Sequence, residues 1–588
     1  MVSCYNVENN MKKLLKYFNN YKGRSVLAPL FKLLEATFEL LVPIVVGLTV
    51  DKGIAKGDTA YVVWMCALLA LFGVLGFGFS VVAQYFAART ATGVSADIRK
   101  DLFGKLQTLS YADIDRLGVS TMLTRMTSDV DKLQSGINLA LRLFLRSPFI
   151  VFGAAITACF IDASLVWIFF LAIALLAIVV FAVMLICMPL YKSAQEKLDK
   201  VTLSSRENLT GARVLRAFCQ EENERALFDK RNKALNNSRK VVGAIASVTN
   251  PLTFVLVNLS IILLLYVGAI RVDGGLLSQG SVIALYNLMG QILIELIKLA
   301  NLIVTVTKAA ACGGRISAVL DMKPSLEFVQ ESVEKTPQTE EDEFFIRFDS
   351  VTMRYNKGAS PAIENLSFGV KKGETVGIIG GTGSGKTTLV HLLAHFYDIE
   401  SGEITVDGKS VRLQAEQSRL RSRIAIVPQK ATLFQGTIRE NLLWGKPDAT
   451  DEQLNSALTR AMASEFVAEK GGLDAAVLQG GKNFSGGQKQ RLTIARALVK
   501  DADILILDDS SSALDYATDA KLRKQIRAIE KTTFIVAQRA SSVKDADKII
   551  VLDEGKAVGI GKHDQLMKTC AVYREIYHSQ YPEGEVAV

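Results

Sequence analysis

The sequence predicts an α-helical membrane domain followed by a soluble α/β domain. Long uncharged runs are confined to the first half of the 588 residues, and short apolar runs alternate with helical stretches in the second half. An acidic, proline-containing stretch separates the two halves. We therefore expect a membrane domain over 1–320, a linker over 321–343 and a soluble domain over 344–588. A composition of 49% hydrophobic and 22% charged residues excludes disordered and fibrous proteins.

Six segments of the first half are long and apolar enough to cross a bilayer. An uncharged helix of about 20 residues spans the hydrocarbon core. Five runs carry no charge: 62–88, 147–161, 163–191, 241–270 and 274–294. The first segment is weaker, because Lys32, Glu35 and Glu39 interrupt it before an apolar stretch. The predicted spans are about 22–50, 60–88, 137–161, 163–190, 245–271 and 279–306.

Basic residues predict the orientation of these spans. They are concentrated in two connections, 89–136 and 192–240, whereas the alternate loops carry only Lys52, Lys56 and Arg271. The positive-inside bias places both termini, the long connections and the soluble domain in the cytoplasm of a bacterial cell, with the spans in its plasma membrane. The net charge of +9 therefore reflects topology, and nucleic-acid binding is not expected.

A short segment precedes the first span. Met11, Leu14, Leu15 and Phe18 share one helical face, and lysines lie off it. This pattern predicts an interfacial helix along the inner leaflet, with an ordinary surface helix as the alternative.

Charged side chains lie within the first and the sixth predicted spans. Glu35 and Glu39 fall in the first span, and Glu295 and Lys298 fall in the sixth, about one helical turn apart. Charges are costly in lipid and should face a partner or a cavity. They could form a route for amphipathic cations or ion pairs between helices, and the sequence leaves both open.

The soluble domain contains a glycine-rich phosphate-binding motif. A strand candidate over 375–379 is followed by the pattern G-x-x-x-x-G-K-T in the strand–loop–helix setting that a P-loop requires. Glycines let backbone N–H groups curl around phosphates, and the following helix presents its positive end. The predicted nucleotide-binding residues here are Gly380, Gly381, Thr382, Gly383, Ser384, Gly385, Lys386, Thr387 and Thr388.

A second motif predicts a magnesium site. Residues 504–507 form an apolar run that ends in Asp508, as in the Walker B strand of P-loop proteins. We expect Asp508 to hold Mg²⁺ through water and Thr387 to bind it directly. Seven scattered cysteines, none in a C-x-x-C pair, predict neither a disulfide framework nor a zinc site.

Further motifs resemble those of one family. The stretch 484–491, with Ser485, Gly486, Gly487 and Gln488, resembles the signature motif of ATP-binding cassette (ABC) proteins. The resemblance also includes Gln429 at the Q-loop position, the D-loop 512–515, and Tyr355 where the family stacks an aromatic ring on adenine. With six preceding spans, the whole chain is similar to a half-transporter of the ABC exporter class.

This resemblance implies a dimer that binds two ATP molecules with Mg²⁺ between its cassettes. Each ATP would contact the P-loop and Walker B strand of one subunit and the signature of the other. Ser485, Gly486, Gly487 and Gln488 are therefore expected to contact the partner's ATP, while Gln429 joins Thr387 and Asp508 around the metal. Short helices near 111–116 and 211–218 are expected to transmit cassette closure to the spans.

Two positions of the ATP site depart from the family pattern. Asp509 stands where the family places the glutamate that polarises the attacking water, and Gln538 stands where it places the switch histidine. Gln479 also replaces an acid that many exporters have before the signature, and Phe484 replaces the usual leucine. A carboxylate drawn back by one methylene and a neutral amide predict a site that binds ATP but hydrolyses it slowly.

The expected function is ATP-driven export of an amphipathic or hydrophobic small molecule by alternating access. We expect the chain to be the degenerate half of a heterodimer, whose second half-transporter carries the Walker B glutamate and the switch histidine. A homodimer with two weak sites is one alternative. An ATP-gated channel or regulatory subunit is another.

Overall fold

The computed structural model describes residues 13–326, 343–356, 358–413 and 417–581. The chain divides into two compact units. Unit 1 comprises Met1–Thr108 and Val119–Met322, and unit 2 comprises Leu109–Gly118 and Lys323–Val588. Most of the linker expected over 321–343 lies outside the described residues.

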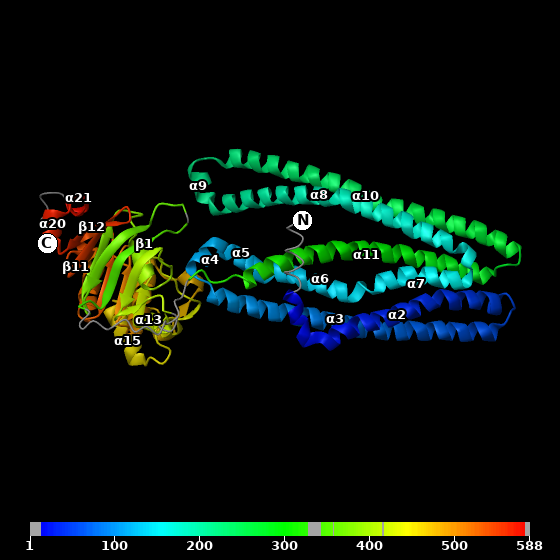
Figure 1. Cartoon of the computed structure of the whole chain (residues 1–588), viewed down its shortest axis with the longest axis horizontal. Helices are drawn as coiled ribbons and strands as arrows, with labels where there is room; N and C mark the ends of the chain where they lie inside the picture. Colours follow the sequence, from blue (N-terminus) through cyan, green and yellow to red (C-terminus); the bar gives the residue numbers. More distant parts are fainter. Residues whose placement is uncertain (1–12, 327–342, 357, 414–416, 582–588) are drawn as a thin grey trace. The chain divides into compact units, whose positions relative to one another are not determined.

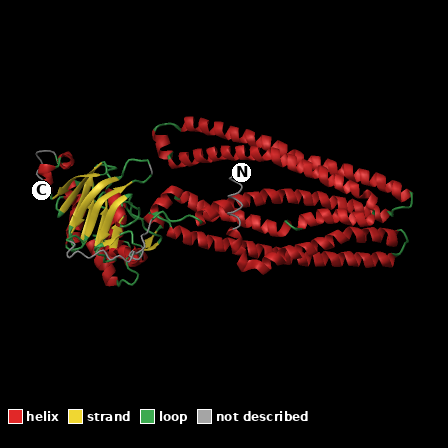
Figure 2. Ribbon diagram, in the orientation of Figure 1, coloured by secondary structure: helices red, strands yellow, loops and turns green. Residues whose placement is uncertain are grey.

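Unit 1 consists of long helices that run side by side (Figures 1 and 2). Its described residues include six helical segments that are long and apolar enough to cross a membrane, one of which, Val119–Ile161, joins several shorter helices. The main helices are α2 (Lys22–Leu48), α3 (Thr59–Thr108), α6 (Val130–Leu143), α7 (Arg146–Ile161), α8 (Val166–Thr210), α10 (Glu221–Asp273) and α11 (Gln279–Leu320). The shorter ones are η1 (Leu15–Tyr21), η2 (Thr49–Ile54), α5 (Val119–Thr124), η3 (Arg125–Asp129), η4 (Ala163–Leu165) and α9 (Ala212–Ala217).

Several spans continue as helix beyond their apolar runs. Helix α3 extends to Thr108 and α8 extends to Thr210, each about 20 residues past the expected span. At 1.5 Å per residue, 20 helical residues add about 30 Å. The expected third span, 137–161, is interrupted where α6 ends at Leu143 and α7 begins at Arg146.

The segment before the first span packs onto the protein itself. Leu14 and Tyr17 are buried in one apolar cluster with Ile98 of α3 and Leu133 of α6. The Tyr17 hydroxyl also donates to Asp101 at 2.7 Å. The segment thus differs from the expected interfacial helix, because part of its apolar face is covered by α3 and α6. Met11 lies outside the described residues.

Helices α2 and α11 meet in close backbone contact. A Cβ added to Gly280 would lie 2.0 Å from the carbonyl oxygen of Gly47. Next to this crossing, Asp51 accepts the backbone N–H of Gly280 at 2.7 Å and the hydroxyl of Ser278. Ser278 is the N-cap residue of α11, so Asp51 supplies a negative charge at the positive end of that helix.

The charged residues within the spans form a network between helices. Arg146 of α7 donates to Glu39 of α2 and to Glu295 of α11, each at 2.6 Å. Glu295 also accepts from Ser147 at 2.8 Å and from Lys298 at 2.7 Å. On α2, Lys32 donates to Glu35. Glu35, Glu39, Glu295 and Lys298 are therefore all paired, which favours ion pairs over a route for amphipathic cations.

Unit 2 contains two main β-sheets. The six-stranded sheet has the order β12-β11-β3-β10-β9-β6 and the four-stranded sheet has the order β2-β1-β4-β5. In the larger sheet all neighbours are parallel except β11 and β12. The strands are β1 (Ile346–Met353), β2 (Ile363–Val370), β3 (Thr375–Gly380), β4 (Ser401–Val406), β5 (Lys409–Ser410), β6 (Ile424–Val427), β7 (Gly436–Thr437), β8 (Ala476–Val477), β9 (Ile504–Asp508), β10 (Thr532–Val536), β11 (Lys548–Asp553) and β12 (Lys556–Gly561).

Helices cover and extend these sheets. They are α4 (Tyr111–Leu117), α12 (Lys386–Leu393), α13 (Gln417–Arg423), α14 (Ile438–Leu443), α15 (Asp451–Arg460), α16 (Ser464–Glu469), η6 (Gly472–Asp474), η7 (Gln479–Gly481), α17 (Gly486–Val499), α18 (Tyr516–Arg527), α19 (Ala540–Val543), α20 (His563–Thr569) and α21 (Ala571–Gln580). The predicted fold class, a helical membrane domain with six spans plus an α/β domain, is confirmed.

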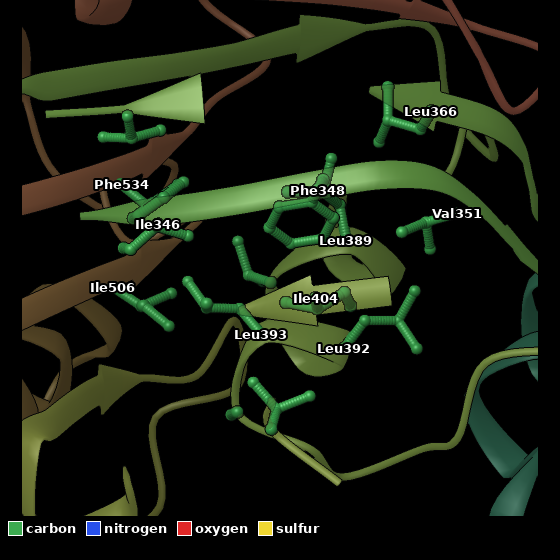
Figure 3. Packing of buried hydrophobic residues seen from close by; sticks show 14 of the residues in the cluster. Ile346, Phe348, Val351, Leu366, Leu389, Leu392, Leu393, Ile404, Ile506 and Phe534 are labelled. Carbon is green, nitrogen blue, oxygen red and sulfur yellow. The ribbon is translucent and has the colours of Figure 1, made fainter. Parts of the chain in front are cut away.

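The core of unit 2 fixes the helix that follows the glycine-rich loop. Phe348 and Ile404 of the smaller sheet pack in one buried cluster with Leu389 and Leu393 of α12 (Figure 3). The larger sheet contributes Phe534 to the same cluster. Because α12 is held from both sheets, its first residues are placed firmly at the end of β3.

Helix α4, which comes from the connection 89–136, packs within unit 2. The ring of Tyr111 stacks on Phe396 with centroids 4.5 Å apart, and Tyr397 donates its hydroxyl to Asp115 at 2.5 Å. Burial and the neighbouring Asp115 raise the pKa of Tyr397, so it remains a hydrogen-bond donor. The short helix predicted near 111–116 is thus present and is joined to the α/β fold.

Candidate functional site

The glycine-rich loop joins β3 to α12 as a tight turn. Gly385, the residue before α12, has φ +98°, and a Cβ there would lie 2.5 Å from the carbonyl oxygen of Ala362. Only glycine satisfies both the conformation and the space. A Cβ at Gly381 or Gly383 would meet nothing within 4 Å, so the loop is open on the side of those residues.

Lys386, Thr387 and Asp508 meet at the carboxyl ends of neighbouring strands. Strands β3 and β9 flank β10 in parallel, which brings their ends to the same edge of the sheet. Thr387 Oγ1 donates to Asp508 Oδ1 at 2.9 Å. Lys386 Nζ donates to the carbonyl oxygens of Gly380 at 2.9 Å and Gly381 at 2.6 Å, so its charge lies across the loop.

The charges of this site are held in a low-dielectric environment. Burial raises the pKa of Asp508, with a further contribution from Asp509, while Thr387 and Lys386 oppose the shift. Burial also lowers the pKa of Lys386, and the two aspartates offset part of that effect. A magnesium ion beside Asp508 and phosphate beside Lys386 are the complementary charges that relieve both costs.

Asp509 accepts hydrogen bonds from two amide side chains. Its Oδ2 atom accepts from Gln538 Nε2 at 2.9 Å and from Gln429 Nε2 at 3.3 Å. Asp509 is only 7% exposed and has φ +46°, in the left-handed region. The structure thus brings Gln429, Asp509 and Gln538 together beside Asp508.

Tyr355 lies at the rim of the same site. Its ring is about half exposed, and its hydroxyl shares a 2.9 Å hydrogen bond with Thr388 Oγ1 of α12. The ring also packs edge-on against Tyr397 at 5.2 Å. A planar base could stack on the exposed face of Tyr355.

The Ser485 motif forms the start of α17. Ser485 Oγ accepts from the backbone N–H of Gln488 at 3.3 Å, and Gln488 Oε1 accepts from the backbone N–H of Ser485 at 3.0 Å. This capping box orders the turn that contains Gly486 and Gly487, and Ser485 and Gly486 are exposed. Phe484 is buried against Phe466. Its replacement of the usual leucine therefore changes the core rather than the exposed surface.

The residues present fit ATP and Mg²⁺. The open glycine loop and Lys386 match a triphosphate, and the hydroxyl–carboxylate pair Thr387 and Asp508 matches the oxygen ligands that Mg²⁺ prefers. Gln429 offers an amide oxygen in the same place, although its nitrogen donates to Asp509 here.

Comparison with family models matches both halves of the chain. Residues 25–296 match the ABC transporter transmembrane region, and residues 363–512 match the ABC transporter model. The chain belongs to the ABC transporter family. It is an exporter half-transporter, with a six-helix membrane domain fused to one ABC cassette, and the cassette implies ATP binding. Exporters of this family act as dimers in the lipid membrane.

Several relatives are similar along nearly the whole chain. An uncharacterized ABC transporter ATP-binding protein of Bacillus subtilis is 34% identical and covers 97% of this chain and 99% of its own. An uncharacterized counterpart in Mycobacterium bovis is also 34% identical over 96% and 97%. The ATP-dependent lipid A-core flippase of Desulfotalea psychrophila is 30% identical over 87% and 89%. A solved bacterial Atm1-family ABC exporter with ATP bound has a TM-score of 0.80 at 23% identity, covering 96% of this chain and 99% of its own. That likeness concerns the fold.

The sequence missed some partners of the residues that it identified. Arg146 lies directly before the uncharged run 147–161 and was not predicted to pair with another span, yet it is the shared partner of Glu39 and Glu295. A basic residue at the start of an uncharged run, with two unpaired acids in other spans, was the available signal. The pairing of Tyr397 with Asp115 had no comparable signal, because 282 residues separate the two.

Proposed function

We propose that this chain is the degenerate half of a heterodimeric ABC exporter. Its own P-loop site binds ATP and hydrolyses it slowly. The observation that carries the proposal is the environment of Asp509, whose Oδ2 atom accepts hydrogen bonds from Gln538 and Gln429. A carboxylate engaged by two amides is poorly placed to orient or deprotonate a water molecule.

The replacement of histidine by Gln538 reinforces this effect. A neutral amide cannot carry the positive charge of an imidazolium, and here its nitrogen is directed at Asp509. In this geometry the Gln538 amide holds the carboxylate of Asp509. Both departures act on the same atom, which favours a disabled site over two unrelated tolerated changes.

The residues that hold nucleotide retain their family identities and a fitting geometry. When bound, Mg²⁺ neutralises charge between the phosphate oxygens, with Thr387 and Asp508 as its holders. Lys386 and the loop N–H groups bind the phosphates, and Tyr355 stacks on adenine. A site with intact binding groups and a weak base is expected to keep ATP bound for longer than one transport cycle.

The Ser485 motif is proposed to contribute to the ATP site of the partner subunit. Its capping box is intact and its first residues are exposed, so the N–H groups of α17 are available to a γ-phosphate from a facing subunit. We infer that Ser485, Gly486, Gly487 and Gln488 complete a fast site on a partner that carries the catalytic glutamate and histidine. Helix α9 is followed by Phe218, 71% exposed, which leaves this tip free to contact a partner as well.

The exported substrate is expected to be amphipathic. A hollow of about 500 Å³ in unit 1 is lined by Phe38, Phe72 and Phe77 and by the charged groups Glu39 and Arg146. Such lining suits a molecule with an apolar body and a polar group.

In the proposed mechanism, closure of the two cassettes is transmitted to the spans through α4 and α9. The cassette and both termini lie in the cytoplasm, under the plasma membrane.

Photolabelling of the complex tests the division of labour. The complex purified from native membranes is incubated with Mg²⁺ and azido-ATP, irradiated, and separated into its chains. We expect this chain to carry mainly unhydrolysed ATP, and vanadate trapping of ADP to label only the partner. Equal trapping of ADP on this chain would contradict the proposal.

A further inference from the structure

The C-terminal helix α21 ends beside the segment that contains Gln538. The side-chain amide of Gln580, its last residue, contacts that segment twice. Gln580 Oε1 accepts the backbone N–H of Ala540 at 2.8 Å, and Gln580 Nε2 donates to the carbonyl oxygen of Gln538 at 2.8 Å. One amide thus satisfies a donor and an acceptor two residues apart, as a neighbouring backbone strand does.

Helix α21 is itself firmly anchored. Tyr573, two turns before Gln580, is fully buried in a cluster with Ala537 and Ala540, which flank the Gln538 segment, and with Ile379 at the end of β3. The Tyr573 hydroxyl shares a 2.8 Å hydrogen bond with His563 Nδ1. The end of α21 is therefore fixed relative to both the glycine-rich loop and the Gln538 segment.

The contacts of Gln580 lead directly to Asp509. Gln580 holds the backbone of Gln538, and the side chain of Gln538 donates to Asp509 Oδ2 at 2.9 Å. In the described part of unit 2, Gln580 is the side chain that bridges Gln538 and Ala540. The position of the Gln538 backbone, and with it the direction in which its side-chain amide points, therefore depends on the end of α21.

We infer that Gln580 is a positioning residue for this nucleotide site, acting through Gln538. By fixing the backbone on both sides of Arg539, it keeps the Gln538 amide on Asp509 and slows the opening of the site around bound nucleotide. Without Gln580, the segment moves more freely and the nucleotide leaves sooner. The inference rests on the proposed function only in expecting a long-lived nucleotide on this chain.

Three variants separate the contributions of Gln580. Gln580→Ala removes both hydrogen bonds, whereas Gln580→Glu keeps the acceptor for Ala540 but cannot donate to Gln538. Ser579→Ala is the matched control, because Ser579 bonds only within its own helix, to Ile576. Each variant is made in the full-length chain within its native complex, and the lifetime of labelled ATP on this chain is measured after dilution into unlabelled ATP.

Loss of two neutral hydrogen bonds predicts about a fivefold shorter nucleotide lifetime for Gln580→Ala. The nucleotide lifetime of Gln580→Glu is expected to lie between those of Gln580→Ala and wild type, and the lifetime of Ser579→Ala is expected to match wild type. The thermal midpoints of all variants should agree within about 2 °C. The deciding readout is a double-mutant cycle, in which Gln580→Ala has no further effect once Gln538 is replaced by alanine.

Additive effects of the two substitutions, or an unchanged lifetime in Gln580→Ala, would overturn the inference. An equal loss in Ser579→Ala would also overturn it, since that result indicates a general weakening of α21. A short nucleotide lifetime in the wild-type complex is a separate outcome. It contradicts the proposed slow site, while the double-mutant cycle still reports on Gln580.

Discussion

Restoring the family residues at two positions should convert the slow site into a hydrolytic one. The perturbation is Asp509→Glu combined with Gln538→His. Glutamate adds one carbon–carbon bond, which advances the carboxylate by about 1.5 Å. Histidine in turn removes the amide that donates to Asp509 Oδ2 at 2.9 Å. Because a misplacement of about 1 Å can cost on the order of 10²-fold in rate, we expect roughly a 100-fold faster hydrolysis on this chain.

The assay must report on this chain alone. A single round of azido-ATP binding is followed by irradiation at increasing times, separation of the chains, and measurement of the ratio of ADP to ATP on the chain of 64.1 kDa. Each single substitution is the control, and we expect it to recover only part of the gain. An unchanged ratio in the double variant would refute the reasoning, because it would show that the two departures are tolerated without limiting hydrolysis.

Three further predictions concern stability, each read from thermal unfolding in mild detergent. Glu295→Ala should destabilise the protein by about 3 kcal/mol, because it leaves buried groups around Arg146 unsatisfied. Glu39→Ala should cost about 1 kcal/mol or less, because the Glu39 side chain is 41% exposed. Equal losses of stability in the two variants would contradict this prediction. Gly280→Ala should sharply lower the thermal midpoint, since its Cβ would lie 2.0 Å from a carbonyl oxygen, while Gly73→Ala, which meets nothing within 4 Å, should not. Burial raises the pKa of Asp113, but hydrogen bonds from Ser110 and Ser325 outweigh it and hold the pKa below its usual range. The stabilisation is therefore present above the unfolded pKa of about 4 and lost as the pH falls through the folded value, so Asp113→Asn should destabilise at pH 7 and progressively less as the pH is lowered below about 4.

Much of the fold could be predicted because it depends on local patterns. A run such as 62–88, without a charge, has few alternatives to a membrane helix, and α3 contains it. The G-x-x-x-x-G-K-T motif likewise requires a strand before it and a helix after it, as β3 and α12 provide. The P-loop residues and Asp508 follow from the same kind of pattern, whereas Gln429 and Asp509 were identified from the resemblance to ABC proteins.

The remainder depends on contacts between distant residues. The sequence pattern predicted an interfacial helix with the apolar face of 11–18 on lipid. In the structure, helices α3 and α6 cover Leu14 of that face. Arg146 and Glu295 are 149 residues apart, and Gln580 is 42 residues from Gln538. No periodicity or motif relates such pairs, because only the packing of α7 on α11, or of α21 on α19, brings them together.

The composition of the native complex tests the central claim most directly. The measurement is the intact mass of the complex extracted from native membranes in mild detergent, followed by identification of its chains. The account predicts this 64.1 kDa chain together with one non-identical ABC half-transporter that carries the Walker B glutamate and the switch histidine. A complex of about 128 kDa that contains only two copies of this 64.1 kDa chain would contradict it.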